Sequence, residues 1–125
     1  MKIVLVCGGR DYTDADRAFE VLDALHAKHT FTWVVHGNAR GADTLGAMWA
    51  DSRNIPSTPY PANWTKHGKA AGPIRNQLML DSEAIDMVVS FPGGRGTADM
   101  VRRAKAKGIP VIDSETIQTS TTTAL

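Results

Sequence analysis

The sequence has little of several things. Its 125 residues include a single cysteine, which excludes an internal disulfide framework and a cysteine-rich zinc site. No run of apolar residues approaches the roughly 18 that a membrane span needs. Net charge is also nearly absent, because 14 Lys and Arg residues are balanced by 13 Asp and Glu residues. This balance argues against bulk electrostatic binding of nucleic acid.

Acidic residues are missing from one long stretch. Between Asp51 and Asp81 there is none, whereas four cationic residues fall there: Arg53, Lys66, Lys69 and Arg75. The near-neutral sum therefore conceals a local excess of positive charge. We expect this excess to serve a small anion on an otherwise balanced surface.

The residues that are present suit one globular domain. The length supports a single domain, and a hydrophobic content of 42% excludes disorder throughout. The apolar start of the chain, Met1–Cys7, is typical of a first strand and not of a signal peptide, so we expect a cytoplasmic protein. From Ser114 the chain becomes rich in Ser and Thr. This composition predicts a domain over 1–113 and a peripheral or disordered polar tail over 114–125.

Strand and helix patterns alternate five times along the chain. The expected strands are 3–7, 32–36, 57–60, 85–91 and 110–112. The expected helices run from Thr13 or Asp14 to about 28, from 42 to about 53, from 73 to about 82 and from 97 to 107. The alternation predicts a three-layer α/β domain, with helices on both faces of a doubly wound parallel sheet. If the strand order is 3-2-1-4-5, ligands bind between the first and fourth strands.

The segment 92–97, Pro-Gly-Gly-Arg-Gly-Thr, is the strongest motif. Its glycines let backbone N–H groups approach an anion, and the helix that Thr97 is expected to open adds partial positive charge. The alternative is a tight turn with a capping threonine. A second glycine loop, Gly8-Gly9-Arg10-Asp11, follows the first strand and favours the phosphate interpretation. It lacks the full dinucleotide fingerprint, and the Walker pattern is absent too.

Three further segments carry polar groups. Asp43 falls in the first turn of a helix, where a carboxylate is favoured by the helix dipole, and the alternative is contact with ribose hydroxyls. Trp64 lies in a lysine-containing segment, 63–69, that is either a solvated loop or a lid that stacks on a base. Arg75 and Asn76 fall in the first turn of the next helix, where a cation opposes the dipole and therefore indicates an anionic partner. His36 is expected to be a hydrogen-bonded residue at a strand end and not a metal ligand.

Together these motifs resemble a known family. The loop 92–97, with the segments 8–11, 36–43 and 72–76, is similar to the YspA-related branch of the SLOG superfamily, which includes the Lonely Guy phosphoribohydrolases and DNA-processing protein A. The similarity extends from Lys2 to about 112. It implies a Rossmann-like sheet that binds nucleotides or nucleotide derivatives.

The Lonely Guy enzymes cleave the N-glycosidic bond between a base and ribose 5′-monophosphate. Their motif continues as P-G-G-x-G-T-x-x-E, and the glutamate position is Met100 here. The resemblance makes Arg75 a candidate catalytic residue, because it corresponds to an arginine of the Lonely Guy site. Asp99 is the second candidate, although it lies one position early, about 100° around the helix, and Asp43 and Asp11 are the alternatives for the missing carboxylate. This departure counts against hydrolysis.

We therefore expect a nucleotide-binding module that acts as a sensor or sequesters its ligand. The alternatives are a nucleotide N-glycosidase and a protein that binds single-stranded DNA, and the charge balance disfavours the DNA-binding role. No cofactor, metal or membrane partner is expected, whereas a homo-oligomer is. The expected ligand-binding residues are Gly8, Gly9, Arg10, Gly37, Arg40, Gly41, Asp43, Asn76, Gly93, Gly94, Gly96 and Thr97, with Trp64 as the lid.

Overall fold

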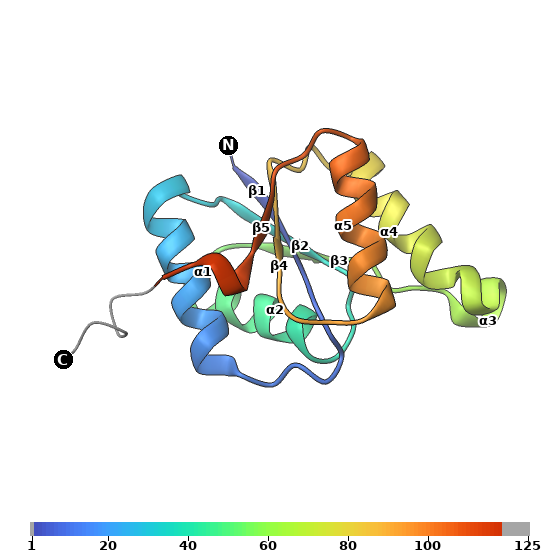
Figure 1. Cartoon of the computed structure of the whole chain (residues 1–125), viewed down its shortest axis with the longest axis horizontal. Coiled ribbons are helices and arrows are strands. Elements are labelled where there is room, and N and C mark those ends of the chain that lie inside the picture. Colours follow the sequence, from blue (N-terminus) through green and yellow to red (C-terminus); the bar gives the residue numbers. More distant parts are fainter. Residues whose placement is uncertain (1, 119–125) are drawn as a thin grey trace.

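The computed structural model describes residues 2–118 and has three layers (Figure 1). At its centre is one five-stranded parallel sheet in the order β3-β2-β1-β4-β5. The strands are β1 (Ile3–Cys7), β2 (Trp33–His36), β3 (Ser57–Pro59), β4 (Met87–Ser90) and β5 (Val111–Asp113). The predicted fold class is therefore confirmed, and the strand order is the one on which the expected ligand site depends.

Helices cover both faces of the sheet (Figure 1). They are α1 (Ala15–His29), α2 (Ala42–Ser52), α3 (Trp64–His67), α4 (Ala71–Ser82) and α5 (Arg95–Ala106), with short 3₁₀ helices η1 (Gly68–Ala70) and η2 (Ser114–Thr116). The helices α1 and α2 pack on one face, and α4 and α5 pack on the other. No helix within residues 2–118 is both long and apolar enough to cross a membrane.

The strand β1 shows how the sequence builds both faces. Val4 and Val6 belong to the core under α1 and α2, while Leu5 and Cys7 belong to the core under α4 and α5. Successive strand residues point to opposite faces, so a continuous apolar run is buried on both sides only in the middle of a covered sheet. This position brings the carboxyl end of β1 to the point where the strand order reverses.

Two helices begin earlier than expected. The helix α4 starts at Ala71, so that Pro73 is its third residue, a place where the missing N–H group costs no intrahelical hydrogen bond. The helix α5 starts at Arg95 and takes in the last residues of the glycine-rich segment. Part of the predicted lid is also helical, since α3 begins at Trp64 and is capped by Asn63, whose side chain accepts from Lys66 N.

The first residues of the predicted polar tail pack against the domain. Ser114 lies in η2 and is 1% exposed, and the Arg17 guanidinium donates hydrogen bonds to the carbonyls of Ser114 (2.8 Å) and Ile117 (2.6 Å). These contacts tie residues 114–117 to α1, because two backbone acceptors are satisfied by one charged donor group. Residues 119–125 of the predicted tail lie outside the described residues.

Candidate functional site

The carboxyl end of β1 and the loop after β4 border an open cavity of about 830 Å³. This main cavity is also lined by α4, α5 and the loop after β2. The predicted site residues that line it are Gly8, Gly9, Arg10, Gly37, Asp43, Trp64, Arg75, Asn76, Gly94, Gly96, Thr97 and Asp99. Arg40, Gly41 and Gly93 do not line it. The two glycine loops therefore border one space, at the crevice that the strand order predicts.

Three loops meet at Gly9, which forms with Gly41 and Gly93 what we call the Gly9 junction. Gly9 N donates to Pro92 O (2.8 Å), and Gly9 O accepts from Ala42 N (3.1 Å). A Cβ atom on Gly41, whose φ is +80°, would lie 2.2 Å from Gly9 O, and one on Gly93 would lie 2.6 Å from Gly9 N. Glycine at 41 and 93 is therefore required by the packing of the loops themselves.

The first turn of α5 is open. A Cβ atom on Gly94 or Gly96 would meet nothing within 4 Å, and neither residue has a positive φ. The helix has no side-chain cap and no acidic residue in its first turn, and its first amides have no intrahelical acceptor. Gly94, Gly96 and Thr97 line the main cavity at this point. This combination of free amides and helix dipole is suited to an anion.

Arg75 holds the loop after β2. Its Nη1 donates to Gly37 O (2.5 Å) and to Tyr60 O (3.5 Å), and its Nε donates to Asn76 Oδ1 (2.9 Å). Burial lowers the pKa of Arg75, and the nearby Asp43 carboxylate opposes that shift. Two of its donor groups are thus committed to the protein, so Arg75 shapes the cavity wall as well as charging it.

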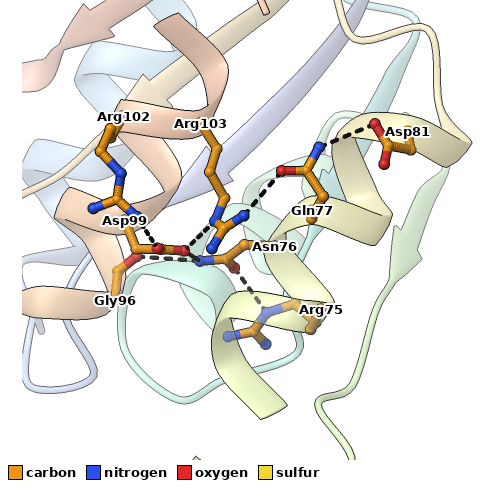
Figure 2. Close-up of polar contacts among 8 residues, drawn as sticks. All are labelled: Arg75, Asn76, Gln77, Asp81, Gly96, Asp99, Arg102 and Arg103. Carbon is orange, nitrogen blue, oxygen red and sulfur yellow. Dashed lines mark hydrogen bonds and ion pairs between the residues drawn. The ribbon is translucent and has the colours of Figure 1, made fainter. Parts of the chain in front are cut away.

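Asn76 joins α4 to α5 (Figure 2). Its side chain is 4% exposed, and its Nδ2 donates to Asp99 Oδ2 (3.0 Å) and Gly96 O (3.3 Å). Asp99 also accepts from Arg102 (2.6 Å) and Arg103 (2.8 Å). Burial by itself raises the pKa of Asp99, but the hydrogen bonds from Arg103 and Asn76 and the two arginine charges hold it below its usual range. Asp99 is therefore an ionised residue bound by partners from both helices.

Asp43 is the second carboxylate of the cavity and differs from Asp99. It is 6% exposed, and its Oδ2 accepts from Gly37 N (3.0 Å) and Ala39 N (3.3 Å). Burial raises the pKa of Asp43 to about 6, against the backbone hydrogen bonds and the Arg75 charge, which lower it. Asp43 lines the main cavity, so its carboxyl group borders the space that a ligand would occupy.

The predicted lid contacts the glycine loop of β1. The Arg10 guanidinium lies over the Trp64 ring, with 5.1 Å between Cζ and the ring centroid, a cation–π contact. Trp64 is 47% exposed. Lys69 lines the main cavity, as expected, whereas Lys66 does not. The segment from Trp64 to Lys69 thus brings one aromatic ring and one lysine to the cavity.

Cys7 and His36 are of residue types that often act in catalysis, but here they have structural roles. Burial raises the pKa of the Cys7 thiol to about 12, so it is protonated at neutral pH and is a poor nucleophile. His36 is 5% exposed, and its Nδ1 accepts from Asn38 N (3.1 Å), as expected for a hydrogen-bonded residue at a strand end. Within residues 2–118, no three His, Cys, Asp or Glu side chains gather where they could hold a metal ion.

Comparison with known proteins identifies the family. The YspA, cpYpsA-related SLOG family matches residues 2–67. The chain belongs to this SLOG family. It is also 39% identical over 121 residues to the Gene 61 protein of Mycobacterium phage D29, a match that covers 90% of this chain and 96% of that protein.

Solved structures share the fold of this SLOG chain. TM1055 has a TM-score of 0.68 at 22% identity, over 89% of this chain and 72% of that one. DNA processing protein A from Streptococcus pneumoniae has a TM-score of 0.73 at 18% identity, over 90% of this chain and 50% of that one. The chain therefore spans half of DNA processing protein A, and at these identities the likeness concerns the fold alone.

The position at which the Lonely Guy motif has its glutamate is apolar in this SLOG chain. Met100 is 1% exposed and belongs to the core between the sheet and the helices α4 and α5, at the edge of the main cavity. Two cationic residues that line the cavity, Arg95 and Arg102, were not predicted from the sequence. Their spacing offered a signal, because residues seven apart lie on the same face of a helix.

Proposed function

We propose that this SLOG protein binds a nucleotide or a nucleotide-derived ligand in the main cavity, as a sensor or as a sequestering protein. The phosphate lies at the first turn of α5, against the amides near Gly94, Gly96 and Thr97. The base lies toward Trp64, which is exposed enough to stack on it. A volume of about 830 Å³ is within the range that small-molecule sites occupy.

One observation carries this proposal: the glycine at position 96, in the first turn of α5, is unexplained by the fold. Glycine inside a helix destabilises it by roughly 1 kcal/mol relative to alanine. At Gly96 nothing in the described structure requires that loss, since a Cβ atom would meet no neighbour and φ is not positive. Close approach of a ligand to the helix amides supplies the missing reason.

The charges around the cavity support an anionic ligand. Among the described residues that line it, five are cationic and only Asp43 and Asp99 are acidic. The cationic residues are Arg10, Lys69, Arg75, Arg95 and Arg102. Because Asp99 is already bound to two arginines, the field that a phosphate meets at the start of α5 is positive.

The test is calorimetric titration of the purified protein with adenosine 5′-monophosphate, and with adenosine as the control that lacks the phosphate. We expect the monophosphate to bind and adenosine to bind at least about tenfold more weakly, because a charge-assisted hydrogen bond contributes about 1.5–3 kcal/mol. Replacing Arg95 with alanine weakens binding of the monophosphate. The matched variant Lys105→Ala removes an exposed cation of the same helix that lines no described cavity and leaves binding unchanged.

Equal binding of adenosine and its monophosphate would reject the phosphate site. An equal loss in the Arg95 and Lys105 variants would instead show a diffuse effect of net charge. A third possibility is that the protein prefers a base other than adenine. Repeating the titrations with guanosine, cytidine and uridine monophosphates would identify this case.

A second candidate function, hydrolysis of the N-glycosidic bond, is favoured by Asp43. A buried carboxyl group that lines the cavity and has a pKa of about 6 is suited to proton transfer near neutral pH. In this reaction water adds to C1′, the C1′–N bond breaks, and the base nitrogen receives a proton, giving free base and ribose 5-phosphate. Asp99 is less suited, because its oxygens accept from Arg102, Arg103 and Asn76.

Chromatography for free base, after incubation of the protein with nucleoside monophosphates, tests this second candidate. If hydrolysis occurs, Asp43→Asn abolishes it, since the amide still accepts from Gly37 N but transfers no proton. The variant Asp99→Asn retains at least part of the activity. Loss of activity in the Asp99 variant alone would restore the expected role of Asp99, and no release of any base would leave the binding function.

A further inference from the structure

A second cavity, of about 390 Å³, opens beside the main one. It lies between the loop after β2 and the segment that leads from β3 into α3. Arg40, which is absent from the main cavity, lines this one together with Arg10 and Arg75. None of the described residues that line it is acidic. The second cavity is therefore more uniformly cationic than the first.

The two cavities are contiguous. Five residues line both: Arg10, Gly37, Ala39, Trp64 and Arg75. The Arg10 guanidinium over the Trp64 ring thus stands at the border between them. Arg75 faces both spaces while its Nη1 holds Gly37 O. A ligand that occupies the main cavity has a short path past this border.

Two arginines of the second cavity, Arg10 and Arg40, have partners that a ligand could replace. Arg40 is 3.4 Å from Asp11, but their side chains are 75% and 96% exposed, and such surface pairs contribute little. Arg10 contacts the face of an indole ring, which has no formal charge. Guanidinium groups bind phosphate in a bidentate manner and gain more from it than from either of these contacts.

We propose that the second cavity binds a second phosphate group of the same ligand, so that the ligand is a small nucleotide with a second phosphate-bearing unit. This inference rests on the proposed function, which assigns the first phosphate to α5. The Arg10–Trp64 pair separates the two phosphate subsites, with Arg40 contributing to the second subsite only. A volume of about 390 Å³ is within the usual range for a small-molecule site.

The experiment compares adenosine 5′-monophosphate with three probes that carry two phosphates, by calorimetric titration of the full chain. The probes are adenosine 3′,5′-bisphosphate, the 5′-phosphorylated dinucleotide pApA and diphosphate-linked diadenosine. We expect at least one probe to bind about tenfold more tightly than the monophosphate, as one added charge-assisted contact provides. Arg40→Ala lowers the affinity for the two-phosphate probe more than the affinity for the monophosphate, so that the advantage is lost. The matched variant Asp11→Ala removes the partner of Arg40 and keeps the advantage.

The outcomes separate this inference from the function on which it rests. Binding of the monophosphate with no gain for any two-phosphate probe overturns the second subsite alone. A gain that survives Arg40→Ala overturns it too, because the second phosphate then lies elsewhere. No binding of any nucleotide overturns both proposals. A ten-nucleotide single strand is titrated as a further probe. If it alone binds more tightly than the monophosphate, the ligand is nucleic acid and the small-nucleotide proposal is wrong.

Discussion

The glycines of the Gly9 junction and those that open α5 differ in the space that surrounds them. At the junction, a side chain on Gly41 or Gly93 would collide with backbone atoms of Gly9. At the start of α5, a side chain on Gly94 or Gly96 would enter open space. A glycine-rich motif can therefore contain both glycines that folding requires and glycines that only ligand binding requires. Only the second kind is evidence of function.

The largest effect is expected at the Gly9 junction. Gly41→Ala places a Cβ atom 2.2 Å from Gly9 O and forces alanine to a φ of +80°. Strain and overpacking each cost about 1–3 kcal/mol, so we expect the free energy of unfolding to fall by about 3 kcal/mol or more. Urea denaturation followed by circular dichroism measures it. A loss below about 1 kcal/mol would mean that the junction is loose, and would remove the contrast with α5.

The two carboxylates of the cavity extend the comparison to pH. The folded protein holds the Asp43 proton up to about pH 6, whereas the unfolded chain releases it near 3.8. Native Asp43 therefore binds more protons between these values, and its contribution to stability falls by about 2–3 kcal/mol as the pH rises from 3.8 to 6. The pKa of Asp99 is lowered, so its contribution is present above its unfolded pKa and is lost as the pH falls.

Denaturation between pH 3.5 and 7.5 checks these opposite signs. The stability of the wild type relative to Asp43→Asn should decrease with rising pH. The stability relative to Asp99→Asn should increase over the same interval. If both differences rise with pH, the hydrogen bonds and the Arg75 charge lower the pKa of Asp43 more than burial raises it, and Asp43 loses its suitability for proton transfer.

A smaller loss is expected where α4 meets α5. Asn76→Ala removes three partly buried hydrogen bonds, with Arg75, Gly96 and Asp99, and should lower the free energy of unfolding by about 2 kcal/mol. The neighbouring Gln77 also bonds to two side chains, Asp81 and Arg103, but in a more exposed place (Figure 2). Gln77→Ala should cost about 0.5 kcal/mol. Equal losses would show that Asn76 does not brace the start of α5.

The sequence predicted the fold well because its signals are local. Apolar runs such as Ile3–Cys7 and capping residues such as Asp14 mark elements directly. Asp14 accepts from Arg17 N, as an N-cap does. The ligand site was predicted at the carboxyl ends of the strands, where the main cavity lies, because parallel strands bring these ends together.

The hydrogen bonds of the site side chains could not be predicted from the sequence, because they join segments far apart in the chain. Arg75 meets Gly37 across 38 positions, and Asn76 meets Asp99 across 23. Nothing near Arg40 in the sequence indicates that it faces a second cavity. The distinction between Gly93 and Gly94 also needs the structure, since it depends on where Gly9 lies.

The smallest expected effect has the most diagnostic sign. Gly96→Ala gives α5 a better helix-forming residue in a place where the new Cβ atom meets nothing, so we expect the free energy of unfolding to rise by about 0.5 kcal/mol. The same methyl group stands between the helix amides and the cavity, so nucleotide binding should weaken about tenfold or more. Thermal denaturation and titration of the same preparation measure both effects. Substitution of a glycine required only for folding would lower the stability of the protein, so a gain in stability paired with a loss of binding identifies a glycine that serves the ligand. If Gly96→Ala binds as the wild type does, the phosphate does not lie at the start of α5, whatever the change in stability.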